Sequence, residues 1–345
     1  MSKKLSVILT NALLSVVWAA TAVAATSEQG SSILIFPRVV ADAQHDTVVQ
    51  IVNGSYLPVQ ATCSYLRIGG DPETIEEVDW PIVLQPRQTT HWSATRGRPL
   101  DPNDPVCFGD GIEVIDSRCD GAGFDPGNVP PAPAGFAGEM ICVQTDASGA
   151  PASGNALYGV ATVVDTTDGS VAKLSAFGLR GLDTNNNDGE LCIGQAASGA
   201  CSTAAEYEGC PSRWMLVHPS ESETGDAGGM ATSLTVVTCA QDLVSQEPAE
   251  IDLDITVTNE FEQRFLVTAT VLGSETIALS EISSVFDREV TGELLLSDMT
   301  SSNQRGFVVA AHIDRTDASG GHASLAANLH GDPAQIGAET IRVPQ

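Results

Sequence analysis

Alternation of apolar and polar residues in two stretches of the chain constrains its fold more than any other feature. In the first stretch, Asp46–Gly69, an apolar run precedes the polar turn Asn53-Gly54-Ser55, and the segment after the turn is apolar at every second residue. A period of two is the pattern of a β-strand with one buried face. Asn-Gly favours the positive φ of a tight reversal. This stretch therefore predicts two strands joined by a turn.

The second stretch, 250–273, repeats this plan. A strand, a polar turn that begins at Asn259, a second strand and Gly273 follow one another. The residues of the first strand that are expected to face inward are Ile251, Leu253, Ile255 and Val257. Two such stretches, far apart in the sequence, predict an all-β protein with antiparallel strands.

The N-terminus predicts export. Lys3 and Lys4 precede an apolar run from Leu5 to Val23, and residues 22–24, AVA, have the small-x-small pattern of a cleavage site. Residues 1–24 are therefore expected to be a signal peptide. An uncleaved membrane anchor is the alternative, which the alanine-rich end of the run disfavours. The expected location is secreted, meaning periplasmic, cell-surface or extracellular, without membrane insertion after cleavage.

The cysteines fit an exported protein as well. All eight follow the expected cleavage site, and an even number in such a protein favours disulfides. Their spacings are not those of zinc or haem sites. Proximity and strand position favour four of the possible pairs, namely Cys107–Cys119, Cys192–Cys201, Cys210–Cys239 and Cys63–Cys142.

The net charge of −28 bears on possible partners. Loss of Lys3 and Lys4 with the signal peptide makes the mature chain still more acidic and leaves Lys173 as its single lysine. Such a surface repels phosphate backbones and anionic lipids, so the sequence predicts no nucleic-acid partner and no membrane-surface partner. The expected partner is an extracellular protein or a glycan.

Further segments predict the rest of the strands. Pro37 in the segment 32–40 indicates an edge position or a bulge. The other expected strands lie at 82–95, 139–145, 157–166, 171–179, 214–218, 232–243, 307–313 and 322–329, and one short helix is expected at 279–287. The strands dominate, as an all-β fold requires.

The length of 345 residues suggests two domains. The expected domains are residues 31–181 and 212–345, joined by the Asn/Asp- and Cys-rich loop 182–211. Each is predicted to be an antiparallel, immunoglobulin-like β-sandwich with long disulfide-stapled loops.

Two resemblances add to this interpretation. The order strand, Asn-containing turn, strand, and then the segment LQPRQT at 84–89 resembles the immunoglobulin-like sandwiches of pilus chaperones and major sperm proteins, and implies that architecture for residues 32–95. The phrases GFAGEMICVQTDASGAPASGNALYGVAT, AEYEGCPS and VTNEFEQRF look like those of a group of secreted bacterial proteins of unassigned role. The second resemblance implies an exported β protein and no particular activity.

The candidate metal site is the loop 183–190. Oxygen-bearing residues at nearly alternate positions, followed by a glycine, are how a loop surrounds Ca²⁺. The expected ligands are Asp183, Asn185, Asn187, Asp188 and Glu190. The spacing departs from the EF-hand pattern, because the glycine comes one place late and Gly194 stands where a bidentate Glu belongs. A solvated turn is the alternative, and no cofactor other than Ca²⁺ is expected.

No catalytic residues are predicted. Ser170 and Lys173 match the S-x-x-K of penicillin-binding enzymes, but they lie on a predicted strand and not at the start of a helix. If the last hairpin pairs His312 with His322, two imidazoles would meet on its outer face, where two solvated polar residues are the alternative. Three tryptophans could stack on a sugar or pack in the core, namely Trp80, Trp92 and Trp214.

The sequence therefore favours a non-catalytic structural or binding protein that is secreted or surface-associated. A rigid β fold presents its recognition surface on loops, which here are 96–138, 182–211 and 219–229. The alternative is a secreted hydrolase whose active site is assembled only by the fold. A polymerising subunit is a third hypothesis, which an exposed apolar edge strand would favour.

Overall fold

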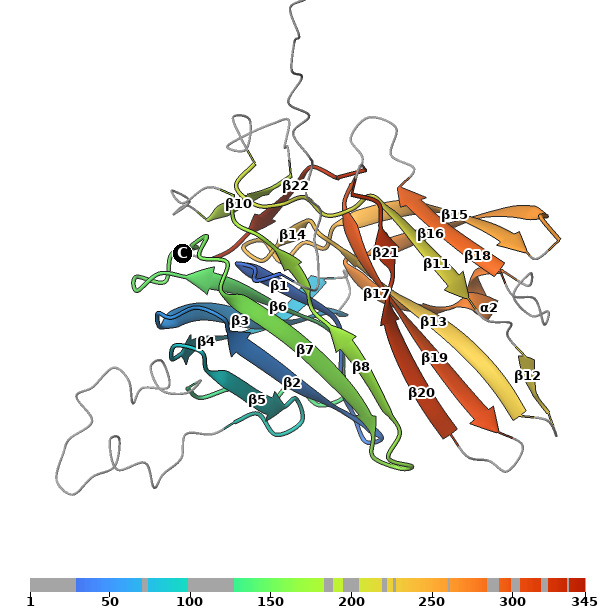
Figure 1. Ribbon diagram of the computed structural model, residues 1–345, viewed down its shortest axis with the longest axis horizontal. Helices are drawn as coiled ribbons and strands as arrows, with labels where there is room; N and C mark the ends of the chain where they lie inside the picture. The colour runs from blue at the N-terminus through green and yellow to red at the C-terminus, as the bar shows by residue number, and fades with distance from the viewer. Residues whose placement is uncertain are drawn as a thin grey trace, which may run out of the picture.

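β-strands make up nearly all of the regular structure in the computed structural model (Figure 1). The structure describes residues 29–69, 74–98, 127–182, 189–194, 205–218, 222–225, 228–259, 261–283, 292–298, 305–317, 322–333 and 335–344. The strands of these residues belong to five sheets. The predicted all-β class is confirmed.

Sheets 1 and 2 come from the first half of the chain. Sheet 1 has the strand order β4-β3-β6-β1-β9, and sheet 2 has the order β5-β2-β7-β8. Their bounds are β1 (Ile33–Ala41), β2 (His45–Asn53), β3 (Val59–Gly69), β4 (Thr74–Leu84), β5 (Thr89–Ser93), β6 (Phe136–Thr145), β7 (Leu157–Asp165), β8 (Val171–Ser175) and β9 (Phe177–Leu179). All neighbouring strands in these two sheets are antiparallel.

Sheets 3 and 4 come from the second half. Sheet 3 has the order β16-β15-β18-β11-β21, and sheet 4 has the order β12-β13-β19-β20, with β17 paired to β13. Their bounds are β11 (Arg213–His218), β12 (Ser222–Gly225), β13 (Gly228–Thr238), β15 (Glu250–Asn259), β16 (Arg264–Leu272), β17 (Ser274–Ala278), β18 (Gly292–Asp298), β19 (Phe307–Asp317), β20 (His322–Asn328) and β21 (His330–Gly331). The small sheet 5 combines β10 (Glu190–Ile193), β22 (Glu339–Arg342) and β14 (Gln241–Asp242).

The prediction of two immunoglobulin-like sandwich domains is wrong. The strands form five small sheets, set as the five blades of a β-propeller. Strands that follow one another in sequence often enter different sheets, since β2 pairs with β5 and β7 whereas β3 pairs with β4 and β6. Alternation identifies a strand and its buried face, but it does not select the strand's partner. The proposed boundary at 182–211 lies partly outside the described residues and stays a prediction.

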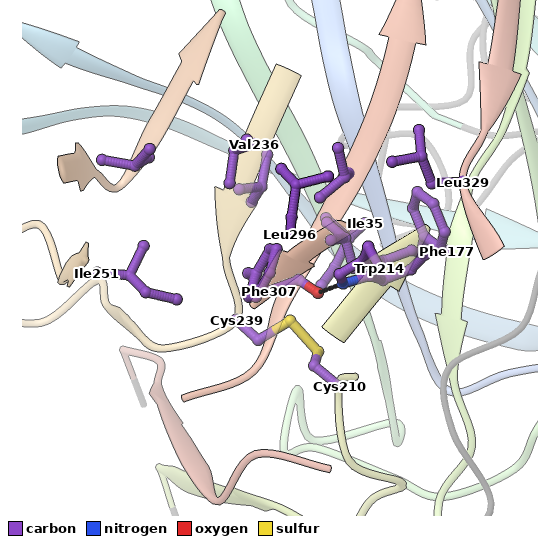
Figure 2. Close-up of a cluster of buried hydrophobic side chains, with 14 of the residues drawn as sticks. Ile35, Phe177, Cys210, Trp214, Val236, Cys239, Ile251, Leu296, Phe307 and Leu329 are labelled. Atoms are coloured by element: carbon purple, nitrogen blue, oxygen red, sulfur yellow. Dashed lines mark hydrogen bonds between the residues drawn. A yellow bond between two sulfur atoms is a disulfide. The ribbon is translucent and has the colours of Figure 1, made fainter. Parts of the chain in front are cut away.

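One buried apolar cluster combines both halves of the chain (Figure 2). Phe177 of β9 meets Trp214 of β11 edge-on, with ring centroids 5.2 Å apart. The Trp214 Nε1–H donates a hydrogen bond of 2.7 Å to the carbonyl oxygen of Phe307. Ile35 of β1 belongs to the same cluster. Burial of side chains of this size contributes about 1.5–3 kcal/mol each, so the two halves share the contacts that stabilise them.

The two stretches that led the sequence prediction differ in how their strands pair. β15 and β16 form the expected antiparallel hairpin around Asn259, and the four predicted inward residues of β15 are all buried. β2 and β3 are strands as predicted, but they lie in different sheets. Gly54 does not adopt a positive φ. It is instead required for space, because a Cβ there would lie 2.5 Å from Cε2 of Tyr158.

Two of the predicted disulfides are confirmed. Cys63 and Cys142 face each other across β3 and β6 and are bonded, and Cys210 is bonded to Cys239 (Figure 2). Cys192 is also disulfide-bonded, whereas its predicted partner and both members of the remaining predicted pair lie outside the described residues.

The short helix is confirmed in part. α2 spans Leu279–Ile282, and residues 284–287 of the predicted helix are outside the described residues. Within the described ranges, no helix has the length and apolarity needed to span a membrane.

Candidate functional site

A cleft of about 170 Å³ lies where sheet 2 meets sheet 4. β8 and β20 form the facing edges of these sheets (Figure 1) and contact each other without pairing. The small apolar residues Ala172, Leu174, Ala310 and Ala326 cluster between them. The cleft therefore sits on a packed seam and gathers side chains from distant parts of the chain.

A bulge in β1 places the side chain of Arg38 at the cleft. The register of β1 against β6 shifts between Phe36 and Val39, as the proline at position 37 predicted. Proline has no N–H for the ladder, and a bulge re-aims the adjacent side chain. Arg38 thereby lines the cleft, and its Nη1 lies 3.5 Å from Oγ of Ser233 on β13.

The electrostatics of Arg38 follow from partial burial. Loss of solvent lowers the pKa of its guanidinium, and the charge of Asp314 acts in the opposite direction. The Nε atom is buried and has no hydrogen-bond partner within the described part of the chain. Arg38 thus lines the cleft as a positively charged side chain whose Nε–H is unsatisfied among the described residues.

His312 and Asp314 lie on one face of β19, two residues apart. His312 Nε2 is 3.0 Å from Oδ1 of Asp314. Ser324, directly opposite Asp314 on β20, donates a hydrogen bond of 2.6 Å to the same oxygen. These contacts, with that of His312 the strongest, hold the pKa of Asp314 at about 2. The carboxylate is therefore ionised at neutral pH.

The other ring nitrogen of His312, Nδ1, has no such partner within the described part of the chain. Only 9% of the side chain is exposed, and Nδ1 is buried without a hydrogen-bond partner among the described residues. A neutral ring with a proton on Nε2 presents a lone pair at Nδ1, whereas an imidazolium presents a second N–H there. The Nδ1 of His312 therefore stays unsatisfied among the described residues in either form of the ring.

The cleft gathers basic side chains in a very acidic protein. Three of the six histidines line it, together with two arginines. These five residues are Arg38, His45, His312, Arg315 and His322. The acidic lining residues are Asp165, Asp168 and Asp314. Such a mixed lining suits a small polar ligand with an anionic or hydrogen-bond-accepting group.

The arrangement does not form a nucleophile with a base. Asp314 stands between Ser324 and His312, whereas a catalytic triad needs the histidine between the serine and the carboxylate. Ser170 Oγ lies 3.4 Å from Ser324 Oγ, so its neighbour in the cleft is another hydroxyl. Lys173 belongs to strand β8, which confirms that the S-x-x-K match does not begin a helix. Among the described residues of this cleft, neither serine is therefore placed beside a histidine that could activate it.

A second, smaller cleft of about 80 Å³ contains a pair of carboxyl groups on β4. Glu77 and Asp79 stand two residues apart on β4 and both line this cleft. Burial, with the hydrogen bond and charge of Asp79 next, raises the pKa of Glu77 well above its ordinary value. Ile141, Val143 and Leu243 contribute apolar walls. The sequence did not indicate this pair.

The calcium loop is largely outside the described residues. Of its five predicted ligands only Glu190 is described, and its Oε1 lies 3.7 Å from Nε of Arg342. The described residues contain no group of three or more His, Cys, Asp or Glu side chains placed to hold a metal. Calcium binding at this loop stays a prediction.

The predicted histidine pair does not form. His312 is opposite Ala326 and His322 is opposite Thr316, because the strands of the hairpin extend further than expected. His312 is also buried and not on a solvated face. The three tryptophans lie in the core, as Trp80, Trp92 and Trp214 are each at most 3% exposed.

Sequence reasoning missed Arg38, Asp314 and Ser324 as site residues. A usable signal was present on β19, where the polar residues His312, Asp314 and Thr316 occupy every second position and thus share one face. Nothing in the sequence placed that face opposite Arg38, which lies 195 residues before its hydrogen-bond partner Ser233.

Comparisons with known proteins give no family for this chain. No family model matches it, and no curated protein matches it. Among solved structures, it is similar to "Crystal Structure of Thermotoga maritima 1070", with 8% identity over 36% of this chain and 97% of that one and a TM-score of 0.29. It is also similar to an apo lectin from Pleurotus ostreatus, with 12% identity over 89% of this chain and 82% of that one and a TM-score of 0.15. Likenesses this low carry no argument about function.

Proposed function

We propose that this protein is an exported, non-catalytic binding protein that takes a small polar ligand in the cleft between β8 and β20. The observation that carries the proposal is the lining of this cleft, in which three histidines and two arginines gather in a very acidic protein. The predicted loops offer a second surface for a protein or glycan partner.

Export is part of the same proposal. The predicted signal peptide supports it, and the two disulfides, Cys63–Cys142 and Cys210–Cys239, fit the oxidising conditions outside the cytosol. A fusion of residues 1–24 to a reporter tests the signal directly. Retention of the reporter in the cytosol would contradict export.

The test of binding is a thermal-shift screen of the mature protein against small acids, sugars and amines. We expect at least one compound to raise Tm in the wild-type protein but not in the Arg38→Gln variant. Arg67→Gln is the matched control, because Arg67 pairs with Glu76 at 2.6 Å on β3 and β4 and is not part of the cleft. A Tm increase that survives Arg38→Gln would place the binding site elsewhere.

A secreted hydrolase is the second candidate function, and the carboxyl pair Glu77–Asp79 is the observation in its favour. A carboxyl group whose pKa is raised by burial, as that of Glu77 is, can act as a general acid. If hydrolysis of any peptide or glycoside is found, Glu77→Gln should abolish it, while Glu76→Gln on the same strand should not.

Calcium binding at 183–190 is tested separately. The expected result is a higher Tm in millimolar Ca²⁺ than in EGTA. Equal Tm values in the two solutions would contradict it.

A further inference from the structure

We propose that two copies of this protein associate through the outer face of sheet 3, about a two-fold axis that runs close to the direction of its strands. The proposal goes beyond the cleft between β8 and β20, because sheet 3 contributes no residue to the lining of that cleft. Four neighbouring strands carry it, namely β16, β15, β18 and β11 (Figure 1).

A row of mostly apolar side chains crosses the outer face of sheet 3. Every second residue of β15 and β18 is buried in the shared core, so the residues between them point outward. The pairing registers align four outward residues on successive strands, and these are Leu266, Thr256, Leu295 and Met215. Leu266 is 67% exposed and Met215 is 41% exposed, and Val217 in the next row is 69% exposed. A partner that removes these apolar groups from water is therefore favoured.

One side of this row has a groove that suits an apolar side chain. The groove has a volume of about 240 Å³, and Met215, Leu295 and Pro333 are among its lining residues. Leu266 stands at the other side of the same row, on the edge strand β16. The exposed leucine and the groove are complementary when a second copy is turned so that its β16 lies over β11 of the first.

The charges beside the apolar row select the same orientation. Arg264 and Glu293 belong to the cross-strand row on one side, and Asp254 and Arg213 belong to the row on the other side. A two-fold axis along the strands, between β15 and β18, brings β16 of one copy over β11 of the other and β15 over β18. Arg264 of one copy then lies beside Glu293 of the second copy, and in the same way Arg213 lies beside Asp254.

These four charged side chains are not used inside the chain. Among the described residues, none of the four forms an ion pair. With two arginines, one glutamate and one aspartate, the three rows are neutral, whereas the whole chain carries a net charge of −28. Two such chains repel each other, but in about 0.15 M salt the repulsion is screened beyond about 8 Å. A neutral face is therefore where two copies of an acidic protein can approach most closely.

The face is large enough for specific association. Its four strands have 6, 10, 9 and 7 residues. At about 3.4 Å per residue and about 4.8 Å between strands they cover roughly 500 Å². Two copies together then bury roughly 1,000 Å², which is the size at which specific interfaces begin. The expected dissociation constant of the dimer is therefore in the micromolar range.

The test is sedimentation equilibrium of the mature protein in about 0.15 M salt, at concentrations from about 0.1 to 100 µM. We expect the mass to rise from that of one chain to that of two chains and to level off there, because a two-fold interface is closed. The mass of one chain at all concentrations, or masses above two chains, would contradict the proposal.

The variant Leu266→Asp locates the interface. It places a charge in the apolar row and should raise the Kd of the dimer at least tenfold. Leu325→Asp is the matched control, because Leu325 on β20 is 60% exposed and lies in sheet 4. Exposed positions tolerate substitution, so both variants should keep the circular dichroism spectrum of the wild type. Equal Kd values for the two variants would reject sheet 3 as the interface.

A charge exchange tests the orientation. Arg264→Glu and Glu293→Arg each place like charges beside each other across the two-fold axis, so each alone should raise Kd about tenfold or more. The double variant restores the pair with exchanged signs, and its Kd should return to within about threefold of the wild-type value. Within one copy Thr258 on β15 separates the two residues, so the rescue reports a contact between copies. A double variant as weak as the single variants would reject the proposed two-fold axis.

Discussion

At the scale of single residues, Asn53 fixes the turn at which the chain leaves sheet 2 for sheet 1. Its buried side chain donates to the carbonyl oxygens of Leu57, Leu84 and Gln85, at 2.8, 3.2 and 2.9 Å. Its Oδ1 accepts a hydrogen bond of 2.8 Å from the N–H of Ser55. One amide thereby closes a crossover between two sheets, which is more than the tight reversal that Asn-Gly indicated.

The variant Asn53→Ala should therefore be strongly destabilised. Removal of the amide leaves buried backbone groups without partners, which we expect to lower the free energy of unfolding by about 2–4 kcal/mol. The measurement is the urea midpoint at unchanged slope. Asn259→Ala is the matched control, since Asn259 makes similar bonds in an exposed turn, and it should cost about 1 kcal/mol or less. Equal losses in the two variants would contradict this account.

Pro37, Arg38 and His312 mark how much of the site could be predicted from the sequence. Pro37 predicted a bulge, because the missing N–H is a local property of the residue. The side chain of Arg38 next to it acquires its role only from Ser233 and Asp314 on other strands. Sequence alone allows a solvated face for His312, because its nearest neighbours in sequence do not reveal that β8 covers that face. Local chemistry was predictable and long-range contact was not.

At the scale of elements, the two disulfides with both cysteines among the described residues join different kinds of neighbours. Cys63–Cys142 joins two residues that are directly opposite on adjacent strands and encloses a sequence separation of 79 residues. Cys210–Cys239 links the segment before β11 to the end of β13 over a separation of 29 residues. The strands could be predicted from their alternation, and these pairs from strand position. The order of strands within each sheet could not, because any strand with one apolar face can pair with any other.

The longer enclosed loop should make the first disulfide the more stabilising one. Loop-closure entropy gives about 4.5 kcal/mol for Cys63–Cys142 and about 3.6 kcal/mol for Cys210–Cys239. Thermal unfolding of the two double variants, Cys63→Ala with Cys142→Ala and Cys210→Ala with Cys239→Ala, compares them. The first pair should have the lower Tm. A reversed order would show that packing around Trp214 outweighs loop length.

At the scale of the whole molecule, buried carboxyl groups make stability depend on pH. Burial raises the pKa of Glu139 to about 8 and that of Glu339 to about 7, and it also raises the pKa of Glu208. Glu139 on β6 accepts a hydrogen bond of 2.9 Å from Gln241 on β14, so it lies where the two halves of the chain meet. Between their ordinary pKa near 4.5 and these raised values, the folded protein binds more protons than the unfolded chain.

Stability should consequently fall as the pH rises from about 5 to 8. Asp314 acts in the opposite sense, because its lowered pKa contributes stability that is lost only as the pH falls toward 2. We therefore expect maximal Tm near pH 4–5. Glu139→Gln, which cannot ionise, should raise the free energy of unfolding by up to about 3 kcal/mol at pH 7 and flatten the decline. The exposed Glu293→Gln is the control, and a wild-type Tm that rises between pH 5 and 8 would contradict the prediction.

The contact between β8 and β20 also protects the protein against aggregation through its edge strands. Each of these strands is the last in its sheet, with a ladder of hydrogen bonds on one side only. An exposed edge strand of this sort can pair with strands of other molecules. Here each edge strand packs against the other. Apolar residues between them, Ala172 and Ala326 among them, hold the two strands together, although no backbone hydrogen bonds join them. The unpaired edges of β8 and β20, which could otherwise pair with strands of other molecules, are thus covered within one polypeptide.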